Sequence, residues 1–340
     1  MKKTRIGVLG LHHDHVWSNL AELNGLDGAE IVGAADPNAP LLTKVAGLYP
    51  GCETFSGYEE MLDAVKPDAV FVFGSNRVGA ELSGKALRRG IHVLVEKPMA
   101  ADLAGAEEML VAMEEGGARL MINLPFAWWP QLQQAIRMAQ EGSVGRIWQV
   151  KYRAAHEGPR ELGCSEYFCE WLYDEKLNGA GALMDYCCYG SALACVLLGK
   201  PEKVSGVTGL LCKKDIEVED NALFTMQYAD AIATTEASWT QVGKLTAYNV
   251  SIFGEKGTMV VTPREGQVLL ATAEDPEGSP VALPEQEVHL KSASAHFLWG
   301  MESGEDFMPL CSAGIGRDGQ AVLEAGLESS KNEAVATVVG

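Results

Sequence analysis

The chain has no uninterrupted apolar stretch that approaches the ~20 residues needed to cross a bilayer. Residues 1–5 lead into a short strand-like segment rather than into the apolar core of a signal peptide. Positive charge is also scarce, because 27 Lys and Arg face 46 Asp and Glu, a formal net charge of −19. A surface of this sign repels nucleic acid and anionic membranes. We therefore expect a soluble, cytoplasmic protein with neither of them as a partner.

Paired CxxC motifs are missing as well, although eight cysteines are present. A chain of this size does not need a disulfide framework, so we expect reduced thiols that fill small core positions. A zinc centre built from Cys164, Cys169, Cys187 and Cys188 is an alternative, but the spacing matches no compact metal pattern.

The pattern of apolar segments divides the chain into two domains, as expected for 340 residues. In residues 1–123 short apolar segments alternate with helical stretches of about ten residues, which predicts a Rossmann-type, doubly wound parallel sheet. The expected strands are 5–10, 30–36, 69–73, 91–95 and 119–123, and the expected helices are 15–23, 39–48, 78–89 and 103–115.

Residues 124–340 follow a different pattern, which predicts an α+β domain. Several β-rich segments between residues 203 and 270 favour a large, open, mostly antiparallel sheet. The region before residue 180 is expected to be loop-rich, and 274–284 a surface excursion. Further elements are expected at 130–141, 146–155, 183–198, 293–304 and 318–332.

Two separated segments carry groups suited to redox chemistry. Lys97 follows the apolar segment 91–95, at the strand end where ligands bind such sheets, and can polarise a substrate oxygen during hydride transfer. Asp185 and Tyr189 follow a Gly-rich stretch much later in the chain. Together they supply an ammonium, a carboxylate and a phenol, a suitable set for moving a proton while a cofactor moves a hydride.

The turn after the first strand resembles an incomplete dinucleotide fingerprint. Gly10 matches the first glycine of GxGxxG, whereas His12 and Asp14 or His15 stand where small residues are expected. Asp36 ends the second apolar segment, where a carboxylate binds an adenosine ribose and repels a 2′-phosphate. We therefore expect NAD rather than NADP.

The run from His12 to His15 could instead bind a metal. Consecutive residues on a tight turn point in divergent directions, and the i, i+4 spacing of a zinc helix is absent. We therefore expect no metal site. Asp14 is expected to cap the following helix, with a neighbouring histidine against cofactor or substrate.

Several motifs resemble the Gfo/Idh/MocA oxidoreductases, the family of glucose-fructose oxidoreductase and inositol dehydrogenase. They are Gly74-Ser75-Asn76, the segment 86–98 that ends in Glu96-Lys97-Pro98, Trp171 to Asp174, and Gly179 to Asp185. The resemblance covers essentially the whole chain. It departs from the common pattern at Ser75 (usually proline), Gly79 (usually histidine), Cys187 (usually glycine) and after Asn123, where an arginine is missing.

The resemblance implies roles for the three reactive groups. Lys97 would contact the reacting hydroxyl, Asp185 would orient the sugar, and Tyr189 would accept the proton. Tyrosine at this position is similar to the branch with glucose-fructose oxidoreductase and dihydrodiol dehydrogenase. A free phenol titrates near ~10, so a neighbouring Lys97 ammonium would be needed to favour phenolate character at neutral pH.

The implied sites share the crevice between the domains. Aromatic faces stack on the C–H faces of sugar rings, which favours tryptophans near the crevice as substrate contacts, whereas Trp239, inside a strand, is expected in the core. The expected cofactor residues are Gly10, Leu11, His12, His13, Asp36, Ser75, Asn76, Glu96, Lys97 and Asn123. The expected substrate residues are Trp128, Trp129, His156, Trp171, Asp185 and Tyr189.

The leading prediction is an NAD-dependent oxidoreductase that acts on a secondary hydroxyl of a sugar, glycoside or polyol. The resemblance also implies a homodimer or homotetramer formed through the sheet of the second domain. Two alternatives stay open. One keeps NAD bound and uses transient oxidation for glycoside cleavage or exchange, and the other is a redox-inactive sugar- or nucleotide-binding sensor, motivated by the incomplete glycine fingerprint.

Overall fold

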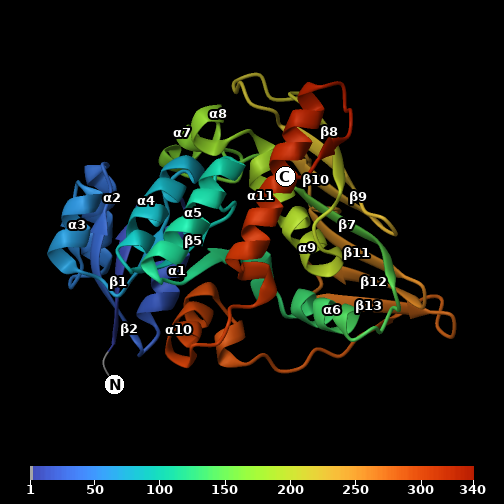
Figure 1. The fold of residues 1–340 in the computed structure, drawn as a ribbon, viewed down its shortest axis with the longest axis horizontal. Helices are drawn as coiled ribbons and strands as arrows, with labels where there is room; N and C mark the ends of the chain where they lie inside the picture. Colours follow the sequence, from blue (N-terminus) through green and yellow to red (C-terminus); the bar gives the residue numbers. More distant parts are fainter. Residues whose placement is uncertain (1–2) are drawn as a thin grey trace.

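The computed structural model describes residues 3–340, which form two sheets with helices packed around them (Figure 1). The first sheet is parallel, with the order β3-β2-β1-β4-β5-β6, and confirms the predicted doubly wound fold. The strand order reverses between β1 and β4, which is where such sheets open a ligand crevice. The strands are β1 (Thr4–Leu9), β2 (Ala29–Ala35), β3 (Glu53–Phe55), β4 (Ala69–Val72), β5 (His92–Glu96) and β6 (Leu120–Asn123).

Five helices cover this sheet, and their ends follow local sequence signals. As expected, Asp102 caps α5 by accepting a hydrogen bond from Gly105 N at 2.8 Å. The prediction missed β3 and α3, because a three-residue strand and an eight-residue helix are too short for a clear periodicity. The helices are α1 (His15–Asn24), α2 (Ala39–Leu48), α3 (Tyr58–Val65), α4 (Asn76–Arg88) and α5 (Leu103–Gly116).

The second sheet has the order β14-β13-β12-β11-β7-β10-β9-β8-β15. Only β7 and β10 pair in parallel among the described strands of this sheet, so the predicted mostly antiparallel character is confirmed. The strands are β7 (Ile147–Ala155), β8 (Lys203–Gly209), β9 (Asn221–Gln227), β10 (Ile232–Ser238), β11 (Tyr248–Gly254), β12 (Gly257–Thr262), β13 (Gln267–Thr272), β14 (Ser279–Pro280) and β15 (Thr337–Val338).

The helices of the second half differ from the expectation in two places. The region before residue 180 is not only loop, because Ser165 and Asp174 cap two short helices. The last helix begins five residues early, at Ala313, because Ser312 caps it. The helices are η1 (Pro125–Trp128), α6 (Pro130–Gln140), α7 (Glu166–Leu172), α8 (Glu175–Asn178), η2 (Leu183–Cys187), α9 (Cys188–Leu198), η3 (Val288–Leu290), α10 (Ala293–Ser303), η4 (Pro309–Cys311) and α11 (Ala313–Lys331).

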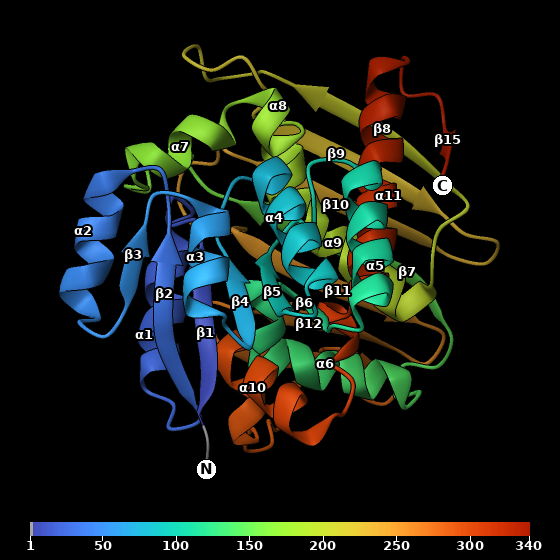
Figure 2. The ribbon, with the colours of Figure 1, turned by 60° about the vertical axis from the view of Figure 1, so that its left-hand side comes forward.

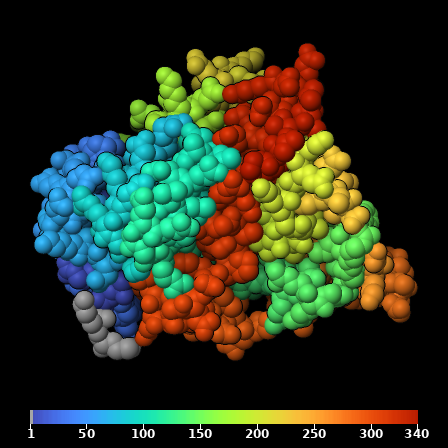
Figure 3. Space-filling model, viewed as in Figure 1, coloured from blue at the N-terminus to red at the C-terminus, as the bar shows by residue number. Residues whose placement is uncertain are grey.

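The C-terminal helices connect the two sheets. α11 lies between α5 and α9, as Figure 1 shows. In Figure 2 it runs alongside α5, and in Figure 3 it fills the seam between the two halves. α10 packs against α1, and its Phe297 meets Phe71 of β4 edge to face at 5.4 Å. Residues far beyond 124 therefore complete the core of the first sheet.

One helical stretch, Glu175–Leu198, is long and apolar enough to cross a membrane by length and composition. However, 78% of its most apolar window is buried inside the protein. The stretch contains α8, η2 and α9, and it forms the core helix behind the second sheet.

Helix α9 touches β7 and β10 through Gly190. A Cβ at this position would lie 2.3 Å from Thr235 Oγ1 and 2.9 Å from Tyr152 Cβ. The small distance between α9 and the sheet at Gly190 therefore also places the neighbouring Tyr189 close to the sheet.

We expect Gly190→Ala to lower the free energy of unfolding by about 1–3 kcal/mol, because overpacking pushes α9 away from the sheet. Urea unfolding measures the change. Gly47→Ala is the matched control: Gly47 is in α2 with nothing within 4 Å of its Cβ, so alanine should raise stability by up to about 1 kcal/mol. Equal stability of Gly190→Ala and the parent chain would contradict this packing argument.

Candidate active site

A buried ion pair joins the two domains at the end of β5. Lys97 Nζ lies 2.5 Å from Asp185 Oδ1 and donates a second hydrogen bond to the Asp185 carbonyl at 2.9 Å. Trp239 Nε1 donates to the other carboxylate oxygen at 2.9 Å. Lys97 is 4% exposed and Asp185 6% exposed. Both groups are therefore held in fixed positions and almost fully removed from water.

The two charges stabilise each other in spite of burial. Burial alone raises the pKa of Asp185, but the Lys97 ammonium outweighs it and leaves that pKa below its usual value. Burial likewise lowers the pKa of Lys97, and the Asp185 carboxylate more than compensates, so that this pKa is raised. The site is therefore an ammonium–carboxylate pair at neutral pH.

The Gly-rich segment before Asp185 needs glycine because backbones meet there. A Cβ on Gly179, whose φ is +100°, would lie 2.2 Å from the Ala101 carbonyl oxygen, and one on Gly181 would lie 2.1 Å from that of Glu219. The Glu219 carboxylate also accepts hydrogen bonds from Gly181 N at 2.7 Å and Leu183 N at 3.0 Å. Glu219, which the sequence did not reveal, therefore fixes the π-helical turn η2 that carries Asp185.

Tyr189 lies beside the ion pair in an aromatic cluster. Lys97 Nζ is 5.1 Å from the centroid of its ring, which stacks on Tyr186 at 5.8 Å and meets Phe126 edge to face at 4.9 Å. Burial raises the pKa of Tyr189 well above its usual value. The neighbouring Lys97 ammonium therefore does not produce phenolate character, because burial disfavours the charged form of Tyr189 and the Asp185 carboxylate adds to this effect.

The turn after β1 has the backbone of a dinucleotide site. Gly10 adopts a φ of +85°, and a Cβ there would lie 2.8 Å from the backbone of Phe73 and Gly74. Only glycine fits this position, which agrees with the role of the first fingerprint glycine.

Asp36 ends β2, where the ribose-binding carboxylate is expected, and it is fully buried. Its Oδ2 accepts a hydrogen bond from Leu11 N at 2.6 Å and lies 2.9 Å from His12 Nδ1, while Oδ1 accepts from Asn38 N at 2.8 Å. Burial raises the pKa of Asp36, but the bonds from His12, Asn38 and Leu11 lower it below its usual value. The side chain is thus an ionised acceptor covered by His12.

The crevice fits a dinucleotide in its strand order, in Gly10 and in Asp36, with one side chain in the way. His12 occupies the position of the second fingerprint glycine, which lets the backbone approach the pyrophosphate. Its Nε2 accepts a hydrogen bond from Ser75 N at 3.1 Å, so the ring bridges three strand ends. His12 therefore lies where the backbone of a complete fingerprint would approach the pyrophosphate of a bound dinucleotide.

The remaining expected cofactor residues have other partners. Asn76 donates to the carbonyl and side-chain oxygens of Asn178, at 2.9 and 2.7 Å, and so ties α4 to α8. Asn123 donates to Glu96 Oε1 at 2.6 Å and accepts from Trp128 Nε1 at 3.0 Å. Asn123 and Glu96 lie together at the crevice, whereas Asn76 lies at the domain contact.

Asp14 does not cap α1, so that expectation is wrong. Its carboxylate accepts hydrogen bonds from Ser165 N at 2.7 Å and Ser165 Oγ at 2.6 Å, because α7 docks on the turn. Trp171 of α7 donates to the His12 carbonyl at 3.3 Å and is 4% exposed, with its ring 5.5 Å from that of His13. Trp171 therefore covers the cofactor turn.

The other expected substrate residues border the aromatic cluster. His156 accepts a hydrogen bond from Gly158 N at 2.9 Å, and its ring lies 5.0 Å from that of Tyr186. Burial lowers its pKa. Trp129 meets Tyr248 edge to face at 5.7 Å. Trp239 is fully buried, as expected, but its bond to Asp185 is a role that its place in a strand could not reveal.

The cysteines do not assemble a zinc centre. All eight are free thiols, and Cys188 donates to the Asp185 carbonyl at 3.2 Å. Within residues 3–340, the only group of three or more potential ligands close enough for one metal is His13, His15 and Glu96.

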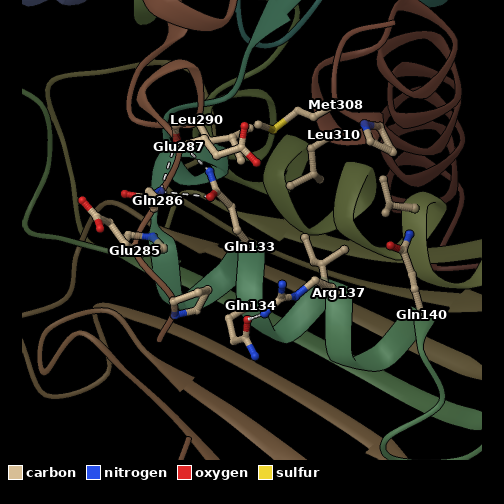
Figure 4. Close-up of a pocket in the computed structure, with 15 residues that line it drawn as sticks. Gln133, Gln134, Arg137, Gln140, Glu285, Gln286, Glu287, Leu290, Met308 and Leu310 are labelled. Carbon is tan, nitrogen blue, oxygen red and sulfur yellow. Dashed lines mark hydrogen bonds between the residues drawn. The ribbon is translucent and has the colours of Figure 1, made fainter. Parts of the chain in front are cut away.

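A separate pocket of about 290 Å³ lies between α6, the segment 284–290 and residues 308–310 (Figure 4). Gln286 spans it by donating to Gln133 Oε1 at 2.9 Å. The pocket contains none of the three reactive groups. A small cavity of about 20 Å³ touches Lys97 on the side of α11, with room for a water molecule, and neither Asp185 nor Tyr189 lines it.

Residues 4–124 match the family model for the oxidoreductase family with an NAD-binding Rossmann fold, and residues 132–260 match the GFO/IDH/MocA C-terminal domain. The chain belongs to the Gfo/Idh/MocA oxidoreductase family. The resemblance seen in its motifs is therefore confirmed, and its first domain is of the NAD-binding type.

Several curated relatives of the chain are named for sugar substrates. The chain is 31% identical over 224 residues to a dTDP-3,4-didehydro-2,6-dideoxy-alpha-D-glucose 3-reductase from Actinomadura kijaniata, covering 65% of this chain and 64% of that protein. It is 26% identical over 251 residues to a D-glucoside 3-dehydrogenase from Escherichia coli K12, covering 69% and 70%. The chain therefore spans a little under two thirds of the length of the first relative.

Solved structures of other family members share the fold. A levoglucosan dehydrogenase in complex with NADH and levoglucosan superposes with a TM-score of 0.84 at 19% identity, covering 99% of this chain and 100% of that one. The WlbA dehydrogenase from Bordetella pertussis, in complex with NADH and UDP-GlcNAcA, gives 0.81 at 22% identity, covering 100% and 99%.

Glu219 makes stability depend on pH. Burial raises its pKa to about 7 in the folded chain, against about 4.3 in an unfolded one. The folded state therefore stays protonated at Glu219 to a higher pH than the unfolded state does. As a result, the free energy of unfolding falls as pH rises from about 4 through 7. We expect Glu219→Gln, which keeps an acceptor for Gly181 N, to be more stable than the parent at pH 8, with a gain that shrinks towards pH 5.

Urea unfolding between pH 5 and 8 measures this dependence. The exposed Glu217, two residues away, offers the matched control Glu217→Gln, which should leave the pH dependence unchanged. A Glu219→Gln variant with the parent's pH dependence would show that Glu219 is ionised throughout.

Proposed function

We propose that this protein is an NAD-dependent oxidoreductase that moves a hydride between nicotinamide and a secondary hydroxyl of a sugar, glycoside or polyol. The observation that carries the proposal is the Lys97–Asp185 pair with Tyr189 beside it, at the carboxyl end of β5 in an NAD-binding fold. NAD, when bound, supplies the hydride acceptor.

Each of the three groups has a defined task. Lys97 stabilises the negative charge that develops on the substrate oxygen, because its ammonium is desolvated and fixed in place. Asp185 holds that ammonium and presents its carboxylate to substrate hydroxyls. Tyr189 exchanges the hydroxyl proton. A neutral phenol suits the donating step directly, whereas the accepting step requires substrate binding to lower its pKa.

The substrate class is supported by the relatives and by the aromatic surroundings. The relatives are named for dideoxyglucose, glucoside and levoglucosan substrates. Trp128, Trp129 and Tyr186 lie around the reactive groups with the flat faces that sugar rings favour. We propose Trp128, Trp129 and His156 as substrate contacts, and Trp171 as a cover of the cofactor turn.

We further propose a cytoplasmic homo-oligomer that packs through the second sheet. β9 alternates buried and exposed residues, so only one of its faces is covered within the chain. The open face still carries large apolar side chains, among them Trp148 at 41% and Leu223 at 43% exposure. A second copy would cover them.

We expect Tyr189→Phe to reduce kcat by about 10²–10⁴-fold, because it removes the proton-transfer group but leaves the ring packing. The assay is reduction of NAD, followed by nicotinamide absorbance, with a panel of sugars and glycosides. Tyr228→Phe is the matched control, since its hydroxyl is buried without a partner in the described chain. Unchanged turnover in Tyr189→Phe would remove the mechanism, and turnover without accumulating NADH would favour the tightly bound cofactor.

His12→Gly tests the cofactor end. It restores the second fingerprint glycine and frees Asp36 Oδ2, so we expect NAD to bind about tenfold more tightly, a difference of about 1.4 kcal/mol. Calorimetry measures this. The gain should vanish in an Asp36→Ala background. Weaker binding by His12→Gly would mean that the imidazole itself contacts the cofactor.

A further inference from the structure

His13, in the turn after β1, and His15, the first residue of α1, converge on a carboxylate from another strand. His13 and His15 lie two residues apart, with ring centroids at 4.6 Å, and His15 Nδ1 lies 3.1 Å from Glu96 Oε2 at the end of β5. One potential ligand atom from each of the three residues lies within 4.8 Å of the other two. His12 diverges towards Asp36, as expected for a tight turn, but the side chains of His13 and His15 do not diverge from each other.

We propose that His13, His15 and Glu96 bind one divalent transition-metal ion of the zinc and iron class. Two ligands about 2.0–2.2 Å from one ion are about 3–3.5 Å apart, and the His15–Glu96 distance falls in this range. Two imidazoles and one carboxylate on an ion leave coordination positions open for an oxygen ligand. The inference goes beyond the proposed function and is tested without it, although His13 and Glu96 are also among the expected cofactor residues.

The charge of Glu96 supports a cation at this position. Glu96 is 4% exposed, yet its only ion-pair partner among residues 3–340 is His15. The adjacent Lys97 turns to Asp185, and Asn123 supplies a neutral hydrogen bond. Because buried charges in proteins are normally paired or bound to metals, a cation beside Glu96 would balance its charge.

His13 adds a second, independent observation. It is 1% exposed, and one ring nitrogen makes only a long contact of 3.3 Å with His15 N. The other ring nitrogen has no hydrogen-bond partner in the described chain. Coordination through Nδ1 would replace this weak contact with a far stronger bond, and coordination through the other nitrogen would give that nitrogen a partner.

An entry path and an outer shell are also present. The side chain of His15 is 39% exposed, so an ion can reach the group from solvent. Asn123 donates to Glu96 Oε1 at 2.6 Å and leaves Oε2 for the ion, as outer partners of metal ligands do. Phe168 and Trp171 enclose the His13 ring at 4.7 and 5.5 Å and restrict its rotation.

The test is a titration of the full chain, free of any histidine tag and of nucleotide, with Zn²⁺ by calorimetry and with Co²⁺ by visible absorbance. We expect one equivalent to bind. His15→Ala and Glu96→Gln should each weaken binding about tenfold or more, as should His13→Phe, which keeps the ring packing. His289→Ala, outside the group, should stay within about twofold.

Absence of stoichiometric Zn²⁺ and Co²⁺ binding would overturn the proposal, and so would binding that both His15→Ala and Glu96→Gln leave unchanged. Circular dichroism of each variant establishes that it is folded, and the partly exposed His15 makes His15→Ala the safest of them. Because the titration contains no NAD and no sugar, its failure leaves the oxidoreductase assay unaffected.

Discussion

The buried contact between Lys97 and Asp185 is the constraint on which the rest of the site depends. Removing either charge from water is unfavourable by several kcal/mol, so each group is tolerable only in the presence of the other. Lys97 comes from the parallel sheet and Asp185 from the second domain. Trp239 holds the second carboxylate oxygen, and Glu219 holds the turn that carries Asp185. The pair therefore fixes how the two domains meet.

At the cofactor end, the turn after β1 is filled by a side chain that also pairs with a buried carboxylate. A full fingerprint leaves empty space above the turn, whereas here His12 fills that space and covers Asp36. Its neighbours His13 and His15 approach Glu96, one residue before Lys97. The histidines at the second and third glycine positions thus contact two buried carboxylates, so the turn is packed without those two glycines.

Much of this architecture could be predicted from local pattern. The alternation of apolar segments and helices was sufficient for the parallel sheet, and the position of Lys97 after a buried strand was sufficient to place it in the crevice. β3 and α3 were missed because they are too short for a periodic signal. The caps of α7 and α8, Ser165 and Asp174, were visible in the sequence, but they competed with a loop-like composition.

The sequence by itself determined the two-domain α/β fold and the family, and it suggested the three groups that we propose to react, because hydrophobic periodicity and short motifs are local properties of the chain. Only the tertiary structure decided the charge state of Tyr189, the covering of Asp36 by His12, and the meeting of His13 and His15 with Glu96. These outcomes depend on contacts between residues 24 to 88 positions apart. Burial and pairing of charges arise only when such residues are brought together in space.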